Sequence, residues 1–392
     1  MKAIWKAVRD FFRTADIFLL IVCLLASVYG IILISSAGRA ISVKLSSGEF
    51  IIVNRSAQFV TVQTISVVIG VVLFIVLSCL PLDLLARFWK WILVFNVIFI
   101  LLLFTPLGKL VNGNRNWLVI PGFPVDIQPA EVVKVTFILV LAKQFAAFSE
   151  RDKLNGLPSV ALLVGHFVLM AGIIFLPSRD VGTIVVYALV FLSMCLAGGL
   201  KLRWFALGGA AIAGAVPILW NFLDPGQQAR ILYGFNPDLD PQNSGWQPIR
   251  SRIAIGGGGM TGQGLYNGVQ NQQAKLPEKQ TDFIFSVAGE ELGFLGCLAI
   301  LLLLSVIVIR CLYVATRSDT QLGAVVSVGI AGMILFQTVI NVGMCLALTP
   351  VIGLTLPFFS YGGSSVITMF AAMGMVSSAY RHPKTYLLSD NS

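Results

Sequence analysis

Long runs of apolar residues dominate the sequence, and short polar segments separate them. A run of about 18 or more apolar residues is long enough to cross the hydrocarbon core of a membrane as a helix. We therefore predict about ten transmembrane helices. They cover approximately residues 16–35, 57–79, 89–107, 129–148, 158–177, 181–199, 203–222, 284–309, 321–347 and 364–380.

The composition supports this interpretation. Hydrophobic residues make up 57% of the 392 residues and charged residues only 11%, whereas roughly a quarter of a soluble domain is charged. A soluble fold of this composition would expose large apolar patches. The strands of membrane β-barrels alternate apolar and polar residues. These runs are continuously apolar, so they do not fit a barrel. We expect an all-α integral membrane protein in which residues 1–392 form a single polytopic domain.

Residues 223–283, between the seventh and eighth predicted spans, form the only long polar segment. It is rich in Gly, Pro, Asn and Gln, and a loop of this length is usually functional or disordered. Apolar anchors within it argue against disorder: Trp246, Ile249, Ile253, Ile255, Leu265 and Tyr266. We predict a structured extracytoplasmic loop with short interfacial helices.

The basic residues predict the orientation in the membrane. Lys2, Lys6, Arg9 and Arg13 precede the first span, which is too long for a cleaved signal peptide and is expected to be a retained anchor. Lys and Arg in short loops favour the cytoplasmic side, and most of them fall on the side of the N-terminus. Both termini are therefore predicted to be cytoplasmic. The formal charge of +9 is spread in small groups, so no nucleic-acid partner is expected.

Asp282 stands where the long loop meets the eighth span. A carboxylate entering an apolar run is costly and is a functional candidate by default. Desolvation would raise its pKa, as a general base requires. The alternative is that Thr281 or Asp282 caps the N-terminus of the helix, and the two roles are compatible.

A second group of charged residues surrounds the start of the fourth span. Pro129 is suited to the first turn of a helix, and Glu131 and Lys134 lie three residues apart, hence on one helix face. They form either an internal ion pair or a site in which Lys134 and Arg115 hold phosphates. In that site Glu131 would orient the lysine or bind a cation. Trp117 is either an interfacial anchor or a stacking platform for a sugar or lipid.

Residues 350–365 contain two prolines and a Gly-Gly pair that break the helices at membrane depth. Irregular backbone is tolerated there only when it is buried in protein or lines a cavity. It is either a tight re-entrant turn or an anion-binding nest before the last span. The candidate substrate-binding residues of this segment are Tyr361, Gly362, Gly363, Ser364 and Ser365.

The Gly-rich stretch 255–264 does not end in Gly-Lys-Ser/Thr and follows no buried strand, so a nucleotide-binding loop is not expected. A reaction at this protein would then use a substrate that is already activated.

Together these segments resemble the SEDS family (shape, elongation, division and sporulation), whose members include RodA and FtsW. The resemblance covers essentially the whole chain. Its carriers are Asn112-Gly113 with Trp117, Gln128-Pro-Ala-Glu-Val-Val-Lys134, Asp180-Val-Gly-Thr183, Ile253-Ala-Ile-Gly256, Gly262-Gln-Gly-Leu-Tyr-Asn-Gly268, Leu276-Pro-Glu-Lys-Gln-Thr-Asp-Phe-Ile-Phe285, Gly289-Glu-Glu-Leu-Gly293, Asn341-Val-Gly-Met344 and Leu356-Pro-Phe-Phe-Ser-Tyr-Gly-Gly-Ser-Ser365.

The resemblance implies a ten-span, inverting peptidoglycan glycosyltransferase of the bacterial cytoplasmic membrane. Such enzymes polymerise lipid II outside the membrane, release undecaprenyl pyrophosphate and pair with a class B penicillin-binding protein. The essential aspartate of the family falls on Asp282, its important tryptophan on Trp117, and its embedded acid and lysine on Glu131 and Lys134. A divalent cation, Mg or Mn, could share in neutralising the leaving group.

The chain departs from the family pattern at a few positions. Ser178-Arg179 replaces the usual Gln-Pro before Asp180, Ala130 replaces a serine, and Arg250 replaces a glutamine. The run Leu265-Tyr-Asn-Gly268 and the short tails look more like RodA than FtsW. The alternatives are a division polymerase of the FtsW type, a lipid II flippase without chemistry, or a non-catalytic scaffold for the penicillin-binding protein.

Overall fold

Each predicted span coincides with a helix in the computed structural model, which describes residues 14–44, 49–111, 114–122, 125–243 and 245–381. Lys2, Lys6, Arg9, Arg13, Asn112 and Gly113 lie outside the described residues. The helices are α2 (Ile17–Ala37), α3 (Ser56–Cys79), α5 (Trp89–Leu101), α6 (Pro129–Ser149), α7 (Leu157–Ser178), α8 (Val181–Gly198), α9 (Leu202–Trp220), α13 (Ile284–Arg317), α14 (Gln321–Cys345) and α15 (Gly363–Arg381).

Seven of these helices are long and apolar enough to cross a membrane: α2, α3, α6, α7, α8, α13 and α14. The apolar helices at Trp89–Phe104, where the 3-10 turn η1 (Leu102–Phe104) continues α5, and at Leu202–Ile218 are shorter. Helix α15 is less apolar because it is almost entirely buried in protein, where small polar side chains such as Ser377 and Ser378 contact other helices. The protein is a multi-pass, mostly helical membrane protein.

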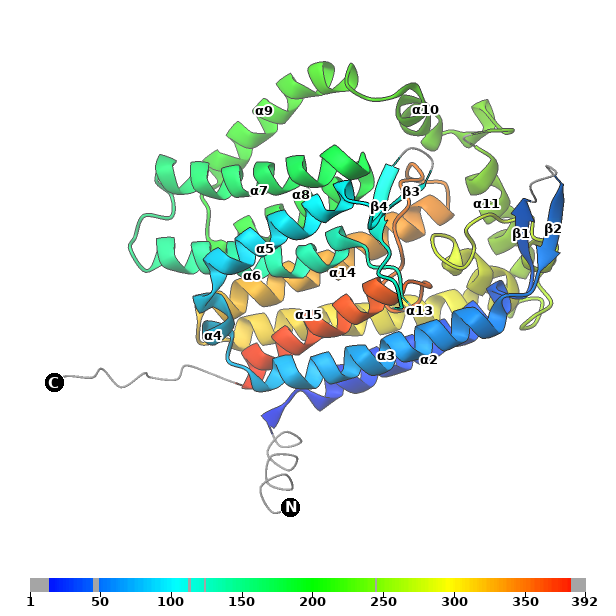
Figure 1. Cartoon of the computed structure of the whole chain (residues 1–392), viewed down its shortest axis with the longest axis horizontal. Helices are drawn as coiled ribbons and strands as arrows, with labels where there is room; N and C mark the ends of the chain where they lie inside the picture. Colours follow the sequence, from blue (N-terminus) through cyan, green and yellow to red (C-terminus); the bar gives the residue numbers. More distant parts are fainter. Residues whose placement is uncertain (1–13, 45–48, 112–113, 123–124, 244, 382–392) are drawn as a thin grey trace, which may run out of the picture.

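The helices run side by side, and α15 lies against α3, α14 and α6 (Figure 1). Helix α14 in turn packs against α13, α8 and α6. The short α4 (Leu82–Arg87) marks the end of the bundle at which α2 begins and α15 ends, and the strands, α10 and α11 mark the opposite end (Figure 1). We call this opposite end the loop end.

The long polar segment is folded. It contains α10 (Pro225–Gly234), the 3-10 turn η2 (Pro237–Leu239), α11 (Trp246–Gly258) and α12 (Val269–Gln272), so the prediction of short helices is confirmed. Helix α11 packs against α13. Two buried carboxylates of α13 bind the segment: Glu291 accepts hydrogen bonds from the Ser36 hydroxyl and the Asn271 side chain at 2.7 Å, and Glu290 accepts from the amides of Gln270 and Asn271.

Two antiparallel hairpins were not expected from the hydrophobic pattern. Strands β1 (Ile41–Lys44) and β2 (Phe50–Val53) form one, and β3 (Gly108–Val111) and β4 (Asn114–Leu118) form the other. Strands of four or five residues give too short an alternation to be recognised beside helices of twenty. The second hairpin matters for function, because β4 carries Trp117 and pairs it with Lys109.

Candidate functional site

Asp282 lies at the loop end, half-buried, two residues before α13 begins. Phe283 occupies the N-cap position, and the cap carries no side-chain hydrogen bond. The Thr281 hydroxyl instead donates to the backbone carbonyl of Glu278. Neither Thr281 nor Asp282 occupies the N-cap position, so the predicted capping role of these residues is wrong.

Three hydrogen bonds hold the backbone around Asp282. Asn341 of α14 donates through its side chain to the Asp282 carbonyl at 2.8 Å and to the Leu354 carbonyl at 2.6 Å. The Tyr361 amide donates to the Gln280 carbonyl at 2.8 Å. These bonds fasten the end of the long loop to the irregular segment 346–362 that separates α14 from α15, as the Pro and Gly residues there predict.

A first cavity, of about 360 Å³, lies between β3–β4 and the start of α15. We call it the aromatic cavity because Trp117 and Tyr361 line it, together with the ion pair Lys109–Asp126, whose N–O distance is 3.1 Å. Burial, with the nearby Asp126 carboxylate, raises the pKa of Tyr361, so its hydroxyl stays protonated and can donate a hydrogen bond. Thr281, the neighbour of Asp282, also lines this cavity.

A second cavity, of about 370 Å³, lies between β4, the α7–α8 turn and α10. We call it the polar cavity, since Asn114, Asn116, Asp180 and Gln227 line it. Gly353 lines it too, and a Cβ atom added to Gly353 would lie 3.6 Å from Oδ2 of Asp282. Asp282 lines neither cavity itself, but it adjoins a lining residue of each, Thr281 of the aromatic cavity and Gly353 of the polar cavity.

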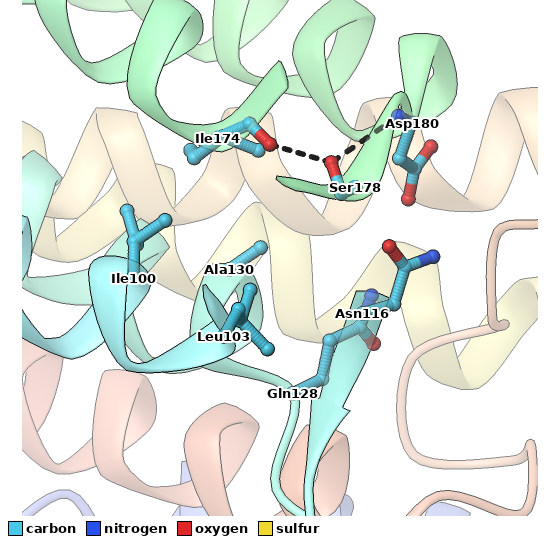
Figure 2. A pocket seen from close by; sticks show the side chains of 8 residues that line it. All are labelled: Ile100, Leu103, Asn116, Gln128, Ala130, Ile174, Ser178 and Asp180. Atoms are coloured by element: carbon cyan, nitrogen blue, oxygen red, sulfur yellow. Dashed lines mark hydrogen bonds between the residues drawn. The ribbon is translucent and has the colours of Figure 1, made fainter. Parts of the chain in front are cut away.

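A narrow pocket of about 10 Å³ shares Asn116, Ser178 and Asp180 with the polar cavity (Figure 2). Asn116, Gln128, Ser178 and Asp180 face this pocket, and apolar side chains such as Ile100 close it on the side of the bundle. The Asn116 Oδ1 atom is buried and has no hydrogen-bond partner among the described residues. A space of this size with polar walls holds one water molecule.

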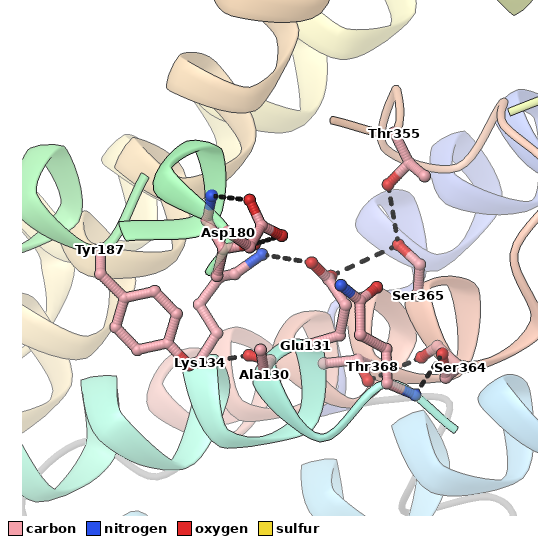
Figure 3. A network of polar contacts seen from close by, with 11 residues as sticks. Ala130, Glu131, Lys134, Asp180, Tyr187, Thr355, Ser364, Ser365 and Thr368 are labelled. Carbon is pink, nitrogen blue, oxygen red and sulfur yellow. Dashed lines mark hydrogen bonds and ion pairs between the residues drawn. The ribbon is translucent and has the colours of Figure 1, made fainter. Parts of the chain in front are cut away.

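Glu131 and Lys134 form a buried ion pair of 2.7 Å at the start of α6, so their expected proximity is confirmed (Figure 3). Ser365 of α15 donates to the second Glu131 oxygen at 3.5 Å, and Asp180 lies close to Lys134 (Figure 3). Burial raises the pKa of the Asp180 carboxyl, while hydrogen bonds from Thr183 and the Lys134 charge oppose the shift. The Lys134 side chain is 0% exposed, so a phosphate reaches it only if this pair opens.

Arg115 and the Gly362 amide are occupied within the protein. The Arg115 guanidinium donates to the backbone carbonyls of Leu103 and Phe104 at the end of η1. The Gly362 amide donates to the Gln63 side chain at 3.2 Å. In this conformation the Gly362 amide is therefore not available to bind an anion at this turn.

The serines that follow this turn fasten α15 to its neighbours. Ser364 accepts a hydrogen bond from the Gln128 amide at the start of α6, and Ser365 contacts Glu131 and the Thr355 hydroxyl. Gly363 packs so closely that an added Cβ atom would meet Val125 at 2.3 Å. These residues set the position of α15 relative to α6.

Asp180 and Lys109 are site residues that the sequence reasoning did not select. Asp180 was noted only as part of the run Asp180-Val-Gly-Thr183, and Lys109 was not singled out. The match of Asp180 to a family motif was the one signal that could have identified it. Lys109 had none, because its place opposite Trp117 depends on the register of a hairpin.

Comparison with known proteins gives consistent matches over most of the chain. Residues 16–385 match the family FTSW_RODA_SPOVE, described as cell cycle protein. The chain is 33% identical over 325 residues to the peptidoglycan glycosyltransferase MrdB of Escherichia coli K12, covering 81% of this chain and 84% of MrdB. It is 35% identical over 326 residues to the probable peptidoglycan glycosyltransferase FtsW of Bacillus subtilis, covering 80% and 79%.

Among solved structures, a chain of a peptidoglycan synthase complex, described as coordinating polymerization and crosslinking, superposes with a TM-score of 0.76. That chain is 27% identical in sequence, and the match covers 94% of this chain and 98% of the other. The fold is thus shared with that chain.

Proposed function

The chain belongs to the FtsW/RodA/SpoVE family, and on this premise we propose that it is a peptidoglycan glycosyltransferase that polymerises lipid II into β-1,4 glycan strands. The names of its relatives support this activity. A flippase or a scaffold would need no proton acceptor at the site.

The observation that carries the proposal is the place of Asp282 between two cavities. A polymerase that joins two glycolipids must hold a donor and an acceptor at once, with a base at their junction. The aromatic and polar cavities of about 360 and 370 Å³ meet that need, and each is within the size range of ligand pockets. Asp282 adjoins both through Thr281 and Gly353.

In the reaction, the Asp282 carboxylate removes the proton from the 4-hydroxyl of the acceptor sugar. The acceptor oxygen attacks the anomeric carbon of the donor, and the bond from that carbon to the pyrophosphate oxygen breaks. The electron pair leaves with undecaprenyl pyrophosphate. A single displacement inverts the α-linked donor to a β-linkage, so the enzyme needs no nucleophile of its own.

The remaining site residues bind the substrate. Trp117 and Tyr361 offer ring faces on which a sugar stacks, and Lys109 beside them provides a positive charge for the pyrophosphate. Lys134 provides a second, deeper positive charge, which becomes available when its buried ion pair with Glu131 opens. Arg115 supports this surface from β4 through its hydrogen bonds to η1, and the residues at the start of α15 support it from the other side: Gly362, Gly363, Ser364 and Ser365.

The described residues do not form a metal centre by themselves, because no three His, Cys, Asp or Glu side chains among them lie close enough to hold a metal ion.

The proposed partner is a class B penicillin-binding protein that crosslinks the new strands in the bacterial cytoplasmic membrane. The related chain from a peptidoglycan synthase complex supports this pairing. We also propose that the loop end, with residues 223–283 and Asp282, is extracytoplasmic and that both termini are cytoplasmic. A role in elongation is favoured by the Leu265-Tyr-Asn-Gly268 run, and an FtsW-like division role is the alternative.

The test is polymerisation of fluorescent lipid II by the purified chain, alone and with a class B penicillin-binding protein. Asp282→Asn keeps the size of the side chain but cannot accept the proton, so we expect the rate to fall by about two to four orders of magnitude. Asp238→Asn, the same change at an exposed ion pair of the same loop, is the matched control and should polymerise normally. Near-normal glycan strands from Asp282→Asn would refute the proposed base.

Orientation is tested separately in intact cells with a membrane-impermeant amine reagent. The exposed Lys275 of the long loop should react, and Lys153, between α6 and α7, should not. Labelling of Lys153 in sealed cells would reverse the assignment and place the site on the cytoplasmic side.

A further inference from the structure

Helix α10 forms one wall of the polar cavity. Asp224, Gln227 and Ile231 line the cavity and recur at intervals of three and four residues, so they share one face of the helix. The opposite wall is Asn114 and Asn116 of β4. Without α10 the cavity would be open along this whole side.

Specific contacts hold both ends of α10 across the cavity. At its start, Asp224 forms an ion pair of 3.2 Å with Arg179, and Gln227 donates from its side chain to the Arg179 carbonyl at 3.0 Å. At its end, Gly234 lies against Pro350, where an added Cβ atom would come within 2.5 Å of the Pro350 Cα. The helix thus bridges the α7–α8 turn and the segment 346–362.

The attachment at Arg179 is weak and reversible. Its side chain and that of Asp224 are 58% and 55% exposed, and exposed ion pairs contribute little to stability. The preceding α9 gives little support, since most of its side chains are exposed and its glycines Gly208, Gly209 and Gly214 have no atom within 4 Å of an added Cβ. Elements with so few buried contacts open at low free-energy cost.

We propose that α10 is a gate that closes the polar cavity over a bound sugar headgroup. Arg179 is its latch, because the ion pair with Asp224 holds α10 in the closed position. This inference rests on the proposed function for the identity of the ligand. The wall residues Asn116 and Asp180 provide the amide and carboxylate groups that recognise sugar hydroxyls and acetamides. Closure holds the sugar beside Asp282 and excludes water from the reacting atoms.

The latch depends on a feature of this chain. Arg179 adopts a left-handed conformation, with φ of 46°, at the C-terminus of α7. A proline, which the family pattern has at this position, is fixed near a φ of about −65° and cannot adopt it. The same substitution that supplies the guanidinium therefore also permits the turn that directs it to Asp224.

The gate is tested by the accessibility of a cysteine placed inside the cavity. In a Cys79→Ser background, which removes the one exposed cysteine, Val351→Cys reports on opening through its reaction rate with a charged maleimide. Arg179→Glu should raise this rate about two- to fivefold, and adding Asp224→Arg should restore it. Gly234→Val, which pushes the other end of α10 from Pro350, should raise it without touching the ion pair.

The matched control is Arg252→Glu, which breaks the exposed Arg252–Asp238 pair of the same loop and should leave the labelling rate unchanged. With Val351 native, Arg179→Glu should also raise the KM for lipid II by a similar factor, and the charge swap should restore it. Unchanged labelling in Arg179→Glu and Gly234→Val, or an unchanged KM, would overturn the gate. Failure of the unmodified chain to polymerise would instead refute the proposed function. The labelling rates would still show whether α10 acts as a gate, because they do not depend on polymerisation.

Discussion

The side chain of Asn341 donates a hydrogen bond of 2.8 Å to the backbone carbonyl of Asp282. Asn341 is fully buried in α14 and uses its other amide hydrogen on the Leu354 carbonyl. One side chain thus fixes the candidate base relative to the segment that separates the two cavities. The carboxylate of Asp282 is positioned from a helix that is far from it in sequence.

We predict that Asn341→Ala lowers the kcat of polymerisation at least about tenfold, with a smaller change in KM, because a small displacement of a general base costs much of its rate. Loss of both Asn341 hydrogen bonds, to the Asp282 and Leu354 carbonyls, should also cost about 1–3 kcal/mol of stability. The control is Gln337→Leu, one turn earlier on α14, whose buried amide has no partner among the described residues. An Asn341→Ala enzyme with normal kcat would show that Asp282 needs no such support.

The buried pair of Glu131 and Lys134 gives a second prediction. Lys134→Ala should abolish polymerisation and lower thermal stability by about 3–5 kcal/mol, because it leaves the Glu131 charge without its partner near Asp180. The double variant Glu131→Gln with Lys134→Met removes both charges and should recover most of the stability. If Lys134 binds the pyrophosphate, that double variant stays inactive. Recovered polymerisation would make the pair purely structural.

The buried Lys279 should make the folding stability of the protein depend on pH. Its ammonium donates to the Asn271 carbonyl and is buried, and burial lowers its pKa to about 8, with Glu291 and Glu290 opposing the shift. The unfolded chain keeps this proton up to a pKa of about 10.4. Between these values the unfolded state binds more protons, so stability should rise with pH, by at most about 3 kcal/mol.

The measurement is thermal unfolding in detergent between pH 7 and 10. Lys279→Met should remove the rise, whereas Lys275→Met, at an exposed lysine of the same segment, should preserve it. A stability that falls or stays level over this range in the unmodified chain would contradict the lowered pKa.

Two glycines of the bundle provide a matched test of packing. An added Cβ on Gly30 of α2 would lie 2.7 Å from the Phe359 Cα, whereas one on Gly165 of α7 meets no atom within 4 Å. Gly30→Ala should cost about 1–3 kcal/mol and reduce polymerisation, since the turn at Phe359 precedes Tyr361. Gly165→Ala should be neutral or stabilise by up to about 1 kcal/mol. Equal unfolding temperatures for the two variants would show that the backbone at Phe359 moves aside without loss of stability.

The sequence by itself determined the helices, because an apolar run long enough to cross a membrane is a local property that needs no knowledge of neighbours. It also determined that Glu131 and Lys134 lie close together, since residues three apart share a helix face whatever surrounds them. Asp282 was selected for the same kind of reason, as an acid at the edge of an apolar run. Its alternative role as a cap failed because helix ends are set by tertiary contacts as much as by the residues themselves.

Only the tertiary structure decided which distant groups meet. The hairpin register that places Lys109 opposite Trp117, the approach of Asp180 to Lys134, and the ion pair of Arg179 with Asp224 all join separate segments. None of these residues carries a local signal for its partner, because hydrophobic periodicity specifies which face of an element is buried and not what is packed against it. The two cavities beside Asp282 exist only where such faces meet, and so their walls could be named only once the helices were packed.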